Sequence, residues 1–96
     1  MINLKNTQSR AERVAQVIKA IAHPLRLRIL AILCEGAKNV STLAVRLDTA
    51  QSLISQHLRI MRSEGLVTAE RKGSRVYYAL AREQLKSLVR HLDDWP

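Results

Sequence analysis

The segment from Gln51 to Arg62, QSLISQHLRIMR, places the strongest constraint on how this chain can fold. Ile54, Leu58 and Met61 recur at i, i+4 and i+7, which is the spacing of the buried stripe of an amphipathic helix. The opposite side carries short polar side chains and guanidinium groups, namely Ser52, Ser55, Gln56, Arg59 and Arg62. The pattern predicts a helix that buries one side and exposes a hydrogen-bonding face.

A glycine and a basic hairpin follow this predicted helix. Gly65 suits the left-handed position that ends a helix, and Leu66 can then pack back against Met61. Residues 66–70 and 75–80 are short runs rich in Val, Leu and Tyr, as in the two strands of a hairpin. The residues between the runs are Arg71, Lys72, Gly73 and Ser74. The sequence therefore predicts a hairpin with a cationic tip.

A second helix is predicted just upstream, over residues 42–47. Ser41 is its expected N-cap, and Val40 and Val45 are spaced as the apolar pair that often flanks such a cap. Only residues 48–50 then separate this helix from the next one, as a helix-turn-helix requires. Two closely connected helices followed by a hairpin form a winged helix-turn-helix.

Hydrophobic spacing predicts further helices on both sides of this motif. One is expected over residues 11–22, and another from Pro24, in its favoured first-turn position, to about Gly36. A last helix is expected over residues 82–93. The predicted fold class is mainly α with a small β-hairpin, a winged helix-turn-helix of about five helices plus the wing.

The domain organisation is expected to be simple. Residues 1–9 are predicted to be a flexible N-terminal segment, and residues 10–96 one domain for DNA binding and dimerisation. So short a chain has a marginal core, and the apolar faces of its first and last helices exceed what that core can cover. We expect these two helices to pair with those of a second copy across a two-fold axis.

Charge and composition restrict the partner and the compartment. Sixteen Lys and Arg against eight Asp and Glu give a formal charge of +8, which favours polyanions. No apolar stretch has the length of a membrane span, and the N-terminus lacks the apolar core of a signal peptide. The one cysteine cannot form an intrachain disulfide. We expect a cytoplasmic protein without a membrane partner.

The polar face of the 51–62 helix has the chemistry to contact bases. Gln pairs with adenine, Arg with guanine, and Ser with a base or a phosphate, all from a helix in the major groove. The predicted DNA-contacting residues of this helix are Gln51, Ser52, Ser55, Gln56, His57 and Arg59. His57 borders the apolar stripe, so it is expected to be structural or to contact phosphate. The alternative for the whole face is an ordinary solvated helix surface.

A second group of residues is predicted to hold the DNA backbone. These residues lie at the start of the 42–47 helix or at the hairpin tip, and they are Ser41, Thr42, Arg71, Lys72, Ser74 and Arg75. Helix N-termini and cations both bind phosphate without regard to base identity. The alternative for the hairpin is that its cations only prevent edge-to-edge pairing of strands.

The run VSTLAVRLDTAQSLISQHLRIMRSEGLVTAERKGSRVYYAL, with AIAHPLRLRILAIL upstream, resembles the ArsR family of bacterial winged-helix repressors. The resemblance implies a homodimeric repressor of an inverted-repeat operator, released when an inducer binds or a thiol is modified. The inducer is unknown from the sequence. Ala50 stands where the family usually has serine, so the helix cap comes from Thr49 or is weaker. The Cys-Val-Cys of the metal-sensing branch is missing, since the chain has Val-Ser-Thr-Leu over 40–43, and no metal site is expected.

Cys34 is the candidate sensor. It follows Leu27, Leu30 and Ala31 on one helical stripe, so a small buried hydrophobic residue is the simpler interpretation. The resemblance offers another, because a thiol-sensing branch of the family has a cysteine at this place, with its disulfide partner near the last helix. This chain lacks that partner, which leaves oxidation of a single thiol or a mixed disulfide.

Other functions find little support in the sequence. His91, Asp93 and Asp94 can be considered as half of an inter-subunit metal site, but Glu83 is the only earlier ligand on that helix. A glycine-rich phosphate loop and a nucleophile beside a base are both missing, so neither an enzyme nor a cofactor is expected. The rival functions are a protein–protein adaptor and an unspecific DNA binder.

Overall fold

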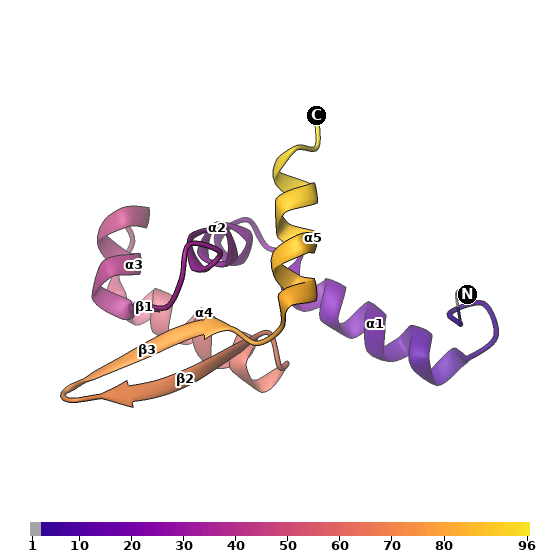
Figure 1. Ribbon diagram of the computed structural model, residues 1–96, viewed down its shortest axis with the longest axis horizontal. Helices are drawn as coiled ribbons and strands as arrows, with labels where there is room; N and C mark the ends of the chain where they lie inside the picture. Colours follow the sequence, from indigo (N-terminus) through magenta and orange to yellow (C-terminus); the bar gives the residue numbers. More distant parts are fainter. Residues whose placement is uncertain (1–2) are drawn as a thin grey trace.

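The computed structural model describes residues 3–96, which form five helices and a small sheet (Figure 1). In chain order the elements are α1 (Gln8–Ile21), α2 (Pro24–Leu33), β1 (Lys38–Asn39), α3 (Val40–Leu47), α4 (Gln51–Ser63), β2 (Val67–Lys72), β3 (Arg75–Leu80) and α5 (Glu83–Asp93). The predicted winged helix-turn-helix of about five helices plus a wing is confirmed. The predicted flexible segment 1–9 begins in residues 1–2, which lie outside the described residues.

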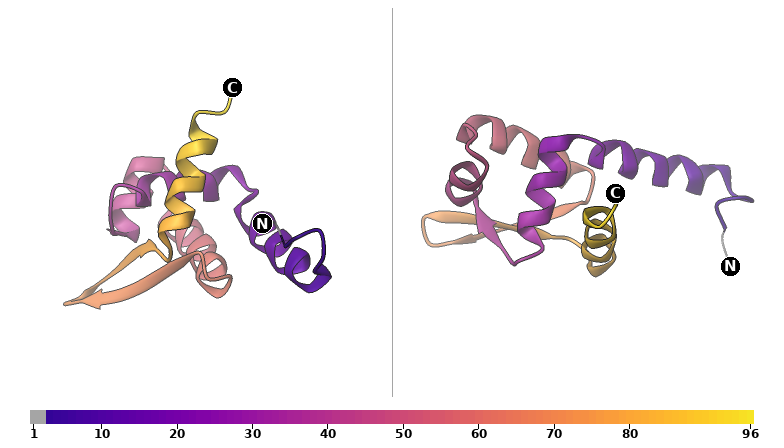
Figure 2. Two further views of the ribbon diagram at one scale, coloured as in Figure 1. Left: turned by 45° about the vertical axis from the view of Figure 1, so that its right-hand side comes forward. Right: turned by 90° about the horizontal axis from the view of Figure 1, so that it is seen from above.

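The wing is the hairpin of β2 and β3, extended by the short strand β1. All three strands are antiparallel in the order β1-β3-β2, with Val67 opposite Leu80 and Lys72 opposite Arg75. Gly73 closes the turn at φ 65°, a conformation that glycine adopts without strain. The hairpin projects from one side of the molecule, and α1 extends on the other (Figures 1 and 2). The two-residue strand β1 was not predicted.

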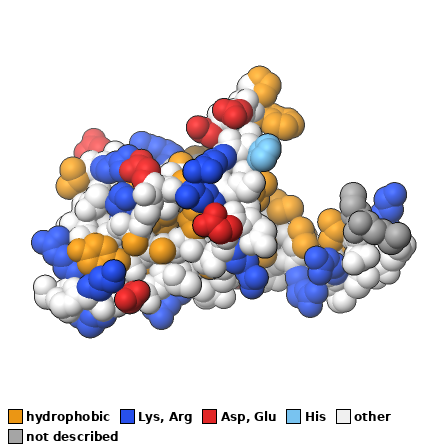
Figure 3. Space-filling model, viewed as in Figure 1, with side chains coloured by type: hydrophobic (Ala, Val, Ile, Leu, Met, Phe, Trp, Pro, Cys, Tyr) orange, Lys and Arg blue, Asp and Glu red, His pale blue; other side chains and the backbone are white. Residues whose placement is uncertain are grey.

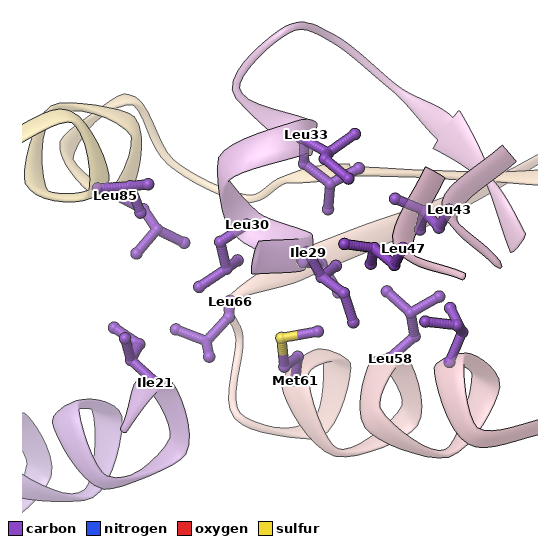
Figure 4. Packing of buried hydrophobic residues seen from close by; sticks show 14 of the residues in the cluster. Ile21, Ile29, Leu30, Leu33, Leu43, Leu47, Leu58, Met61, Leu66 and Leu85 are labelled. Atoms are coloured by element: carbon purple, nitrogen blue, oxygen red, sulfur yellow. The ribbon is translucent and has the colours of Figure 1, made fainter. Parts of the chain in front are cut away.

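The core holds α4 in place. Ile54, Leu58 and Met61, the predicted stripe, are fully buried and belong to the same core cluster as Ile29 of α2 and Leu43 of α3. Figure 4 shows Leu58 and Met61 in this cluster. Burial of an aliphatic side chain of this size contributes about 1.5–3 kcal/mol, so these contacts are the main force that orients the helix. The polar side of α4 consequently faces away from the core.

The end of α4 follows the prediction. Gly65 has φ 74°, the left-handed conformation of a helix terminus, and the Leu66 amide donates to the Met61 carbonyl over 2.9 Å. The Leu66 side chain is only 3% exposed and belongs to the core cluster. The turn therefore directs the chain from α4 straight into the wing.

The start of α3 differs from the prediction. Asn39, not Ser41, is the N-cap, and its Oδ1 accepts a hydrogen bond from the Thr42 amide over 2.9 Å. Val40 is already the first helical residue, and Val45 is 81% exposed, so the expected apolar pair does not form. The reason is tertiary, because pairing of β1 with β3 holds Asn39 in the extended conformation that a cap needs.

Two other helix starts can be compared with expectation, and one of them differs. Helix α1 begins at Gln8, three residues before the predicted Ala11, and the Gln8 side chain donates to Glu12. Its first turn is polar, so hydrophobic spacing could not detect it. Helix α4 has no side-chain cap, since Ala50 occupies that position and the Thr49 hydroxyl donates to the Leu47 carbonyl instead. Of the two stated possibilities for α4, the weaker cap is correct.

Candidate nucleic-acid interface

The exposed side of α4 carries five residues that the sequence predicts to contact bases, and for this predicted role we call them the base-contacting face: Gln51, Ser52, Ser55, Gln56 and Arg59. All of these side chains are exposed. Their exposure follows from the burial of Ile54, Leu58 and Met61 on the opposite side of the same helix. Five hydrogen-bonding side chains are thus held on a rigid element, which is the arrangement needed to contact base edges in a major groove.

His57 lies on the flank of α4 that faces α2, and its side chain is half-buried. Its Nδ1 accepts a hydrogen bond from Nε of Arg26 over 3.0 Å, and its ring centroid is 4.6 Å from that of His23. Burial lowers the pKa of His57, and the nearby His23 and Arg26 lower it further. These contacts give His57 a structural role, which is one of the two roles expected for it. Its contact with DNA stays a prediction.

The short turn between α3 and α4 sets the geometry of the motif. Asp48 adopts the left-handed conformation, with φ 49°, and its amide donates to the Val45 carbonyl. The chain then reverses within residues 48–50. The start of α3 and the start of α4 are therefore fixed relative to each other by three residues and by their shared core.

The start of α3 and the end of the wing lie together. Ser41, Ser74 and Arg75 line one shallow groove with Asn39, so the structure joins residues that the sequence analysis assigned to the DNA backbone. Ser41 is exposed and Thr42 half-buried. The Thr42 amide is already bonded to Asn39, so this helix start offers hydroxyl groups rather than that amide to a phosphate.

The wing tip, defined as residues 71–75, is strongly cationic. Lys72 lies directly opposite Arg75 in the antiparallel register, and both are exposed, as is Arg71. Like charges in facing positions repel, and a bound polyanion would relieve that repulsion. Lys72 also has its Nζ 6.0 Å from the centre of the Tyr77 ring, which directs it along the strand.

Arg46 is the cation of α3 that is already paired. It forms a two-point contact with Glu35, with Nη2 donating to Oε2 over 2.7 Å, and the pKa of Glu35 is lowered chiefly by this hydrogen bond. The pair is exposed to water, so its contribution to stability is small. Figure 3 shows Lys and Arg side chains spread over this view of the molecule, so charge alone does not locate the interface.

Leu53 and Arg26 were missed by the sequence analysis. Leu53 is 40% exposed in the first turns of α4, one position beyond the base-contacting residue Ser52. Its spacing could have indicated this, because it stands about 100° from Ile54 and thus off the buried stripe. Nothing in the local sequence indicated Arg26, whose partner lies 31 residues away.

Cys34 caps the C-terminal end of α2 rather than lying within the core. It is half-buried, and its amide donates to the Leu30 carbonyl over 3.1 Å. Its groove, of about 320 Å³, is also lined by Arg82 and Lys86 at the start of α5. Cys34 packs against the core cluster but is only partly buried, so the interpretation as a small buried hydrophobic residue holds in part.

The C-terminal helix shows no arrangement typical of a metal centre. A ring nitrogen of His91 lies 2.8 Å from the Ser87 carbonyl of the same helix, and Asp93 and Asp94 are exposed. Among residues 3–96 no three His, Cys, Asp or Glu side chains are grouped closely enough to hold a metal ion. Within the same range no helix is long and apolar enough to cross a membrane.

The fold and the exposed face of α4 together define a winged helix-turn-helix DNA-binding domain. The chain belongs to the ArsR family, since residues 23–69 match the family model described as "Bacterial regulatory protein, arsR family" and relatives match over most of their length. The family and these relatives are DNA-binding transcriptional regulators and not enzymes.

Three relatives illustrate the similarity. The transcriptional activator HlyU of Vibrio cholerae is 32% identical over 88 residues, which cover 92% of this chain and 82% of that protein. The biofilm growth-associated repressor of Agrobacterium fabrum is 34% identical over 91 residues, which cover 95% and 78% respectively. The homodimeric winged helix-turn-helix domain of a possible ArsR-family regulator from Mycobacterium bovis superposes with a TM-score of 0.83. It is 33% identical, and the match covers 92% of this chain and 82% of that one.

Proposed function

We propose that this chain is a homodimeric repressor that binds an inverted-repeat operator and leaves it in response to an inducer or a thiol modification. The observation that carries the proposal is the base-contacting face of α4, exposed beside a cationic wing tip. Relatives include both an activator and a repressor. Repression is the simpler action for so small a domain, because it needs only occupation of a promoter. A DNA-bound regulator of this family would act in the cytoplasm.

Exposed apolar side chains on α1, on α5 and just after α5 support the dimer. Ile18 is 56% exposed, Leu88 and Leu92 are each 41% exposed, and Trp95 is 77% exposed. Such residues are stabilised by burial against a second copy, and the Mycobacterium bovis neighbour is a homodimer. Two recognition helices related by a two-fold axis contact successive major grooves about 34 Å apart, which requires an inverted repeat.

The residues of the interface divide into two roles. We assign base recognition to the base-contacting face, that is Gln51, Ser52, Ser55, Gln56 and Arg59. We assign the sugar–phosphate backbone to Ser41, Thr42, Arg71, Lys72, Ser74 and Arg75. His57 bonds to Arg26 on the flank of α4 that faces α2, and this structural contact is its first role. We assign it contact with phosphate as a second role.

Leu53 adds an apolar contact to the base-contacting face. An exposed Leu in the first turns of a recognition helix has one favourable partner in a major groove, the C5-methyl group of thymine. Leu53 lies one turn from Gln56 and His57 on the same side of α4. We therefore expect each half-site to carry a thymine at the position that faces Leu53.

Cys34 is the candidate for the signal. Its groove is lined by Arg82 and Lys86, which would favour an anionic modification of the thiol such as a sulfenate, and also by Glu35 and Glu83, of which Glu35 is already paired with Arg46. Added bulk would separate the end of α2 from the start of α5 and so change the dimer. A Cys34→Ser variant should keep its operator under peroxide while the wild type releases it. Equal release from both proteins would exclude Cys34 as the sensor.

The function is tested by selecting duplexes from a randomised DNA pool with the reduced protein at about 0.15 M salt, where unspecific electrostatic binding is weakened. Enrichment of an inverted repeat is the expected result. Equal retention of all duplexes would identify an unspecific DNA binder. Failure to retain DNA at all would favour the protein–protein adaptor.

A further inference from the structure

The guanidinium group of Arg26, on α2, is bonded to residues of two other helices, α1 and α4. Arg26, in the first turns of α2, donates from Nη1 to the carbonyl of Ala20 near the end of α1 over 3.1 Å. The same side chain donates from Nε to Nδ1 of His57 on α4 over 3.0 Å. Arg26 is partly buried, so water competes only weakly for these bonds. The dimerisation helix and the recognition helix are thus connected through a single residue.

The hydrogen bonds require a particular protonation state. Nδ1 of His57 accepts from Arg26, and Nδ1 of His23 accepts from the Leu25 amide as the N-cap of α2. A nitrogen that accepts a hydrogen bond carries no proton, so the bond from Arg26 requires a His57 ring that is neutral and protonated on Nε2. A second proton on His57 would turn its Nδ1 into a donor that points at the Arg26 donor. Two cations would then be in contact.

The surroundings provide little to offset that repulsion. The groove beside Arg26 is also lined by Lys19 of α1 and Glu64 at the end of α4, one cation and one carboxylate. The second imidazole, His23, stands 4.6 Å from His57 and lowers the pKa of His57, as burial and Arg26 do. The native arrangement therefore favours neutral His57.

We propose that Arg26 and neutral His57 are positioning residues that fix α4 relative to α1, so that discrimination between DNA sequences is lost when His57 is protonated. The inference rests on the proposed function, because α1 holds the partner copy and α4 holds the DNA. A small tilt of α4 on α1 is repeated in both copies and changes the separation of the two recognition helices. Base contacts depend on that separation, whereas backbone contacts tolerate it.

The informative quantity is the ratio between the affinity for the selected operator and the affinity for a scrambled duplex of the same length. Acidification adds positive charge and strengthens binding to any DNA. That general effect is the same for both duplexes and cancels in the ratio. Misplacement of α4 weakens binding to the operator more than binding to the scrambled duplex, so it lowers the ratio. We expect the ratio of the wild type to fall about tenfold between pH 7.5 and pH 5.5, which corresponds to about 1.4 kcal/mol.

Two matched variants separate the imidazoles. His57→Asn places a non-titrating amide oxygen where Nδ1 stands, and we expect its ratio to be high and flat with pH. His23→Asn preserves the helix cap without a titrating ring, and its profile should follow the wild type. An Arg26→Lys variant keeps the charge but lacks the planar fork that reaches both Ala20 and His57, so its ratio should be low at every pH.

Thermal melting of each variant at pH 7.5 separates positioning from loss of fold, since the ratio is compared only among proteins that are folded at the assay temperature. Nitrogen NMR shifts of His57 should report the Nε2-protonated tautomer in the wild type and its loss in Arg26→Lys. Equal pH profiles for His57→Asn and the wild type would overturn the inference about His57. The proposed function would still stand in that case, because it depends on the selected operator. A pool that yields no preferred duplex would overturn both.

Discussion

Asn39 accepts a hydrogen bond from the Thr42 amide while its own backbone pairs with Tyr77 of the wing. Asn39 is 7% exposed, and among residues 3–96 it is the one polar residue that is buried. One residue therefore ends β1, caps α3 and places the start of the helix-turn-helix beside the wing. The two parts of the DNA interface are joined here.

Replacing Asn39 should destabilise the protein. Asn39→Ala removes the cap acceptor of α3, and we expect a loss of about 1–2 kcal/mol in the free energy of unfolding by urea. Asn39→Asp retains an acceptor in the same place and should lose much less. Equal losses in the two variants would show that packing, rather than the cap, makes Asn39 important.

Charge on the outer face of α1 or α5 should prevent dimer formation. Ile18→Glu and Leu88→Glu each place a carboxylate on the proposed interface, and we expect a monomeric mass in sedimentation at about 10 μM, where we expect the wild type to be a dimer. Val45→Glu is the matched control, because Val45 is 81% exposed on α3 and away from both helices. If the protein with both substitutions, Ile18→Glu and Leu88→Glu, were still a dimer, the dimer interface would lie elsewhere on the molecule.

Base recognition and backbone contact should respond differently to mutation. Gln56→Ala is expected to cost about 1–3 kcal/mol of discrimination at one base pair of the selected operator. Lys72→Ala should weaken binding to every duplex alike and reduce the slope of log affinity against log salt by about one unit. Affinities for the operator and its point variants at several salt concentrations test both. If the two variants changed the same quantity, the assignment of separate roles would be wrong.

The thymine contact of Leu53 can be tested by removing one methyl group from the DNA. Deoxyuridine in place of the thymine that faces Leu53 should weaken wild-type binding about fourfold, the equivalent of about 0.8 kcal/mol. The Leu53→Ala protein should not distinguish the two duplexes. Deoxyuridine at a thymine outside the half-sites is the control. A variant that still prefers thymine at the first position would assign the methyl contact to another residue.

Much of the fold could be predicted because it depends on neighbours in the chain. The stripe of Ile54, Leu58 and Met61, the glycine after α4 and the cationic turn of the wing are all local patterns. The exposed residues of α4 could be predicted for the same reason, since burial of one side of a helix exposes the other. Side-chain periodicity is a property of the sequence itself.

The errors occurred where a second segment decides the outcome. Ser41 has the right chemistry for a cap, but pairing of β1 with β3 moves the start of α3 two residues toward the N-terminus and gives the cap to Asn39. Similarly, the sequence left His57 as either a structural or a phosphate-contacting residue, and only the structure shows that its Nδ1 accepts a hydrogen bond from Arg26. Both outcomes depend on contacts between residues far apart in the chain.

The amino-acid sequence by itself determined the class of fold, the polar face of α4 and the charge of the wing, because each follows from residue type and spacing along one element. The tertiary structure alone decided which side chain caps α3 and that Arg26 connects α1 to the recognition helix. The physical reason is that a hydrogen bond or a buried contact needs two partners in space, and a one-dimensional pattern specifies only one of them.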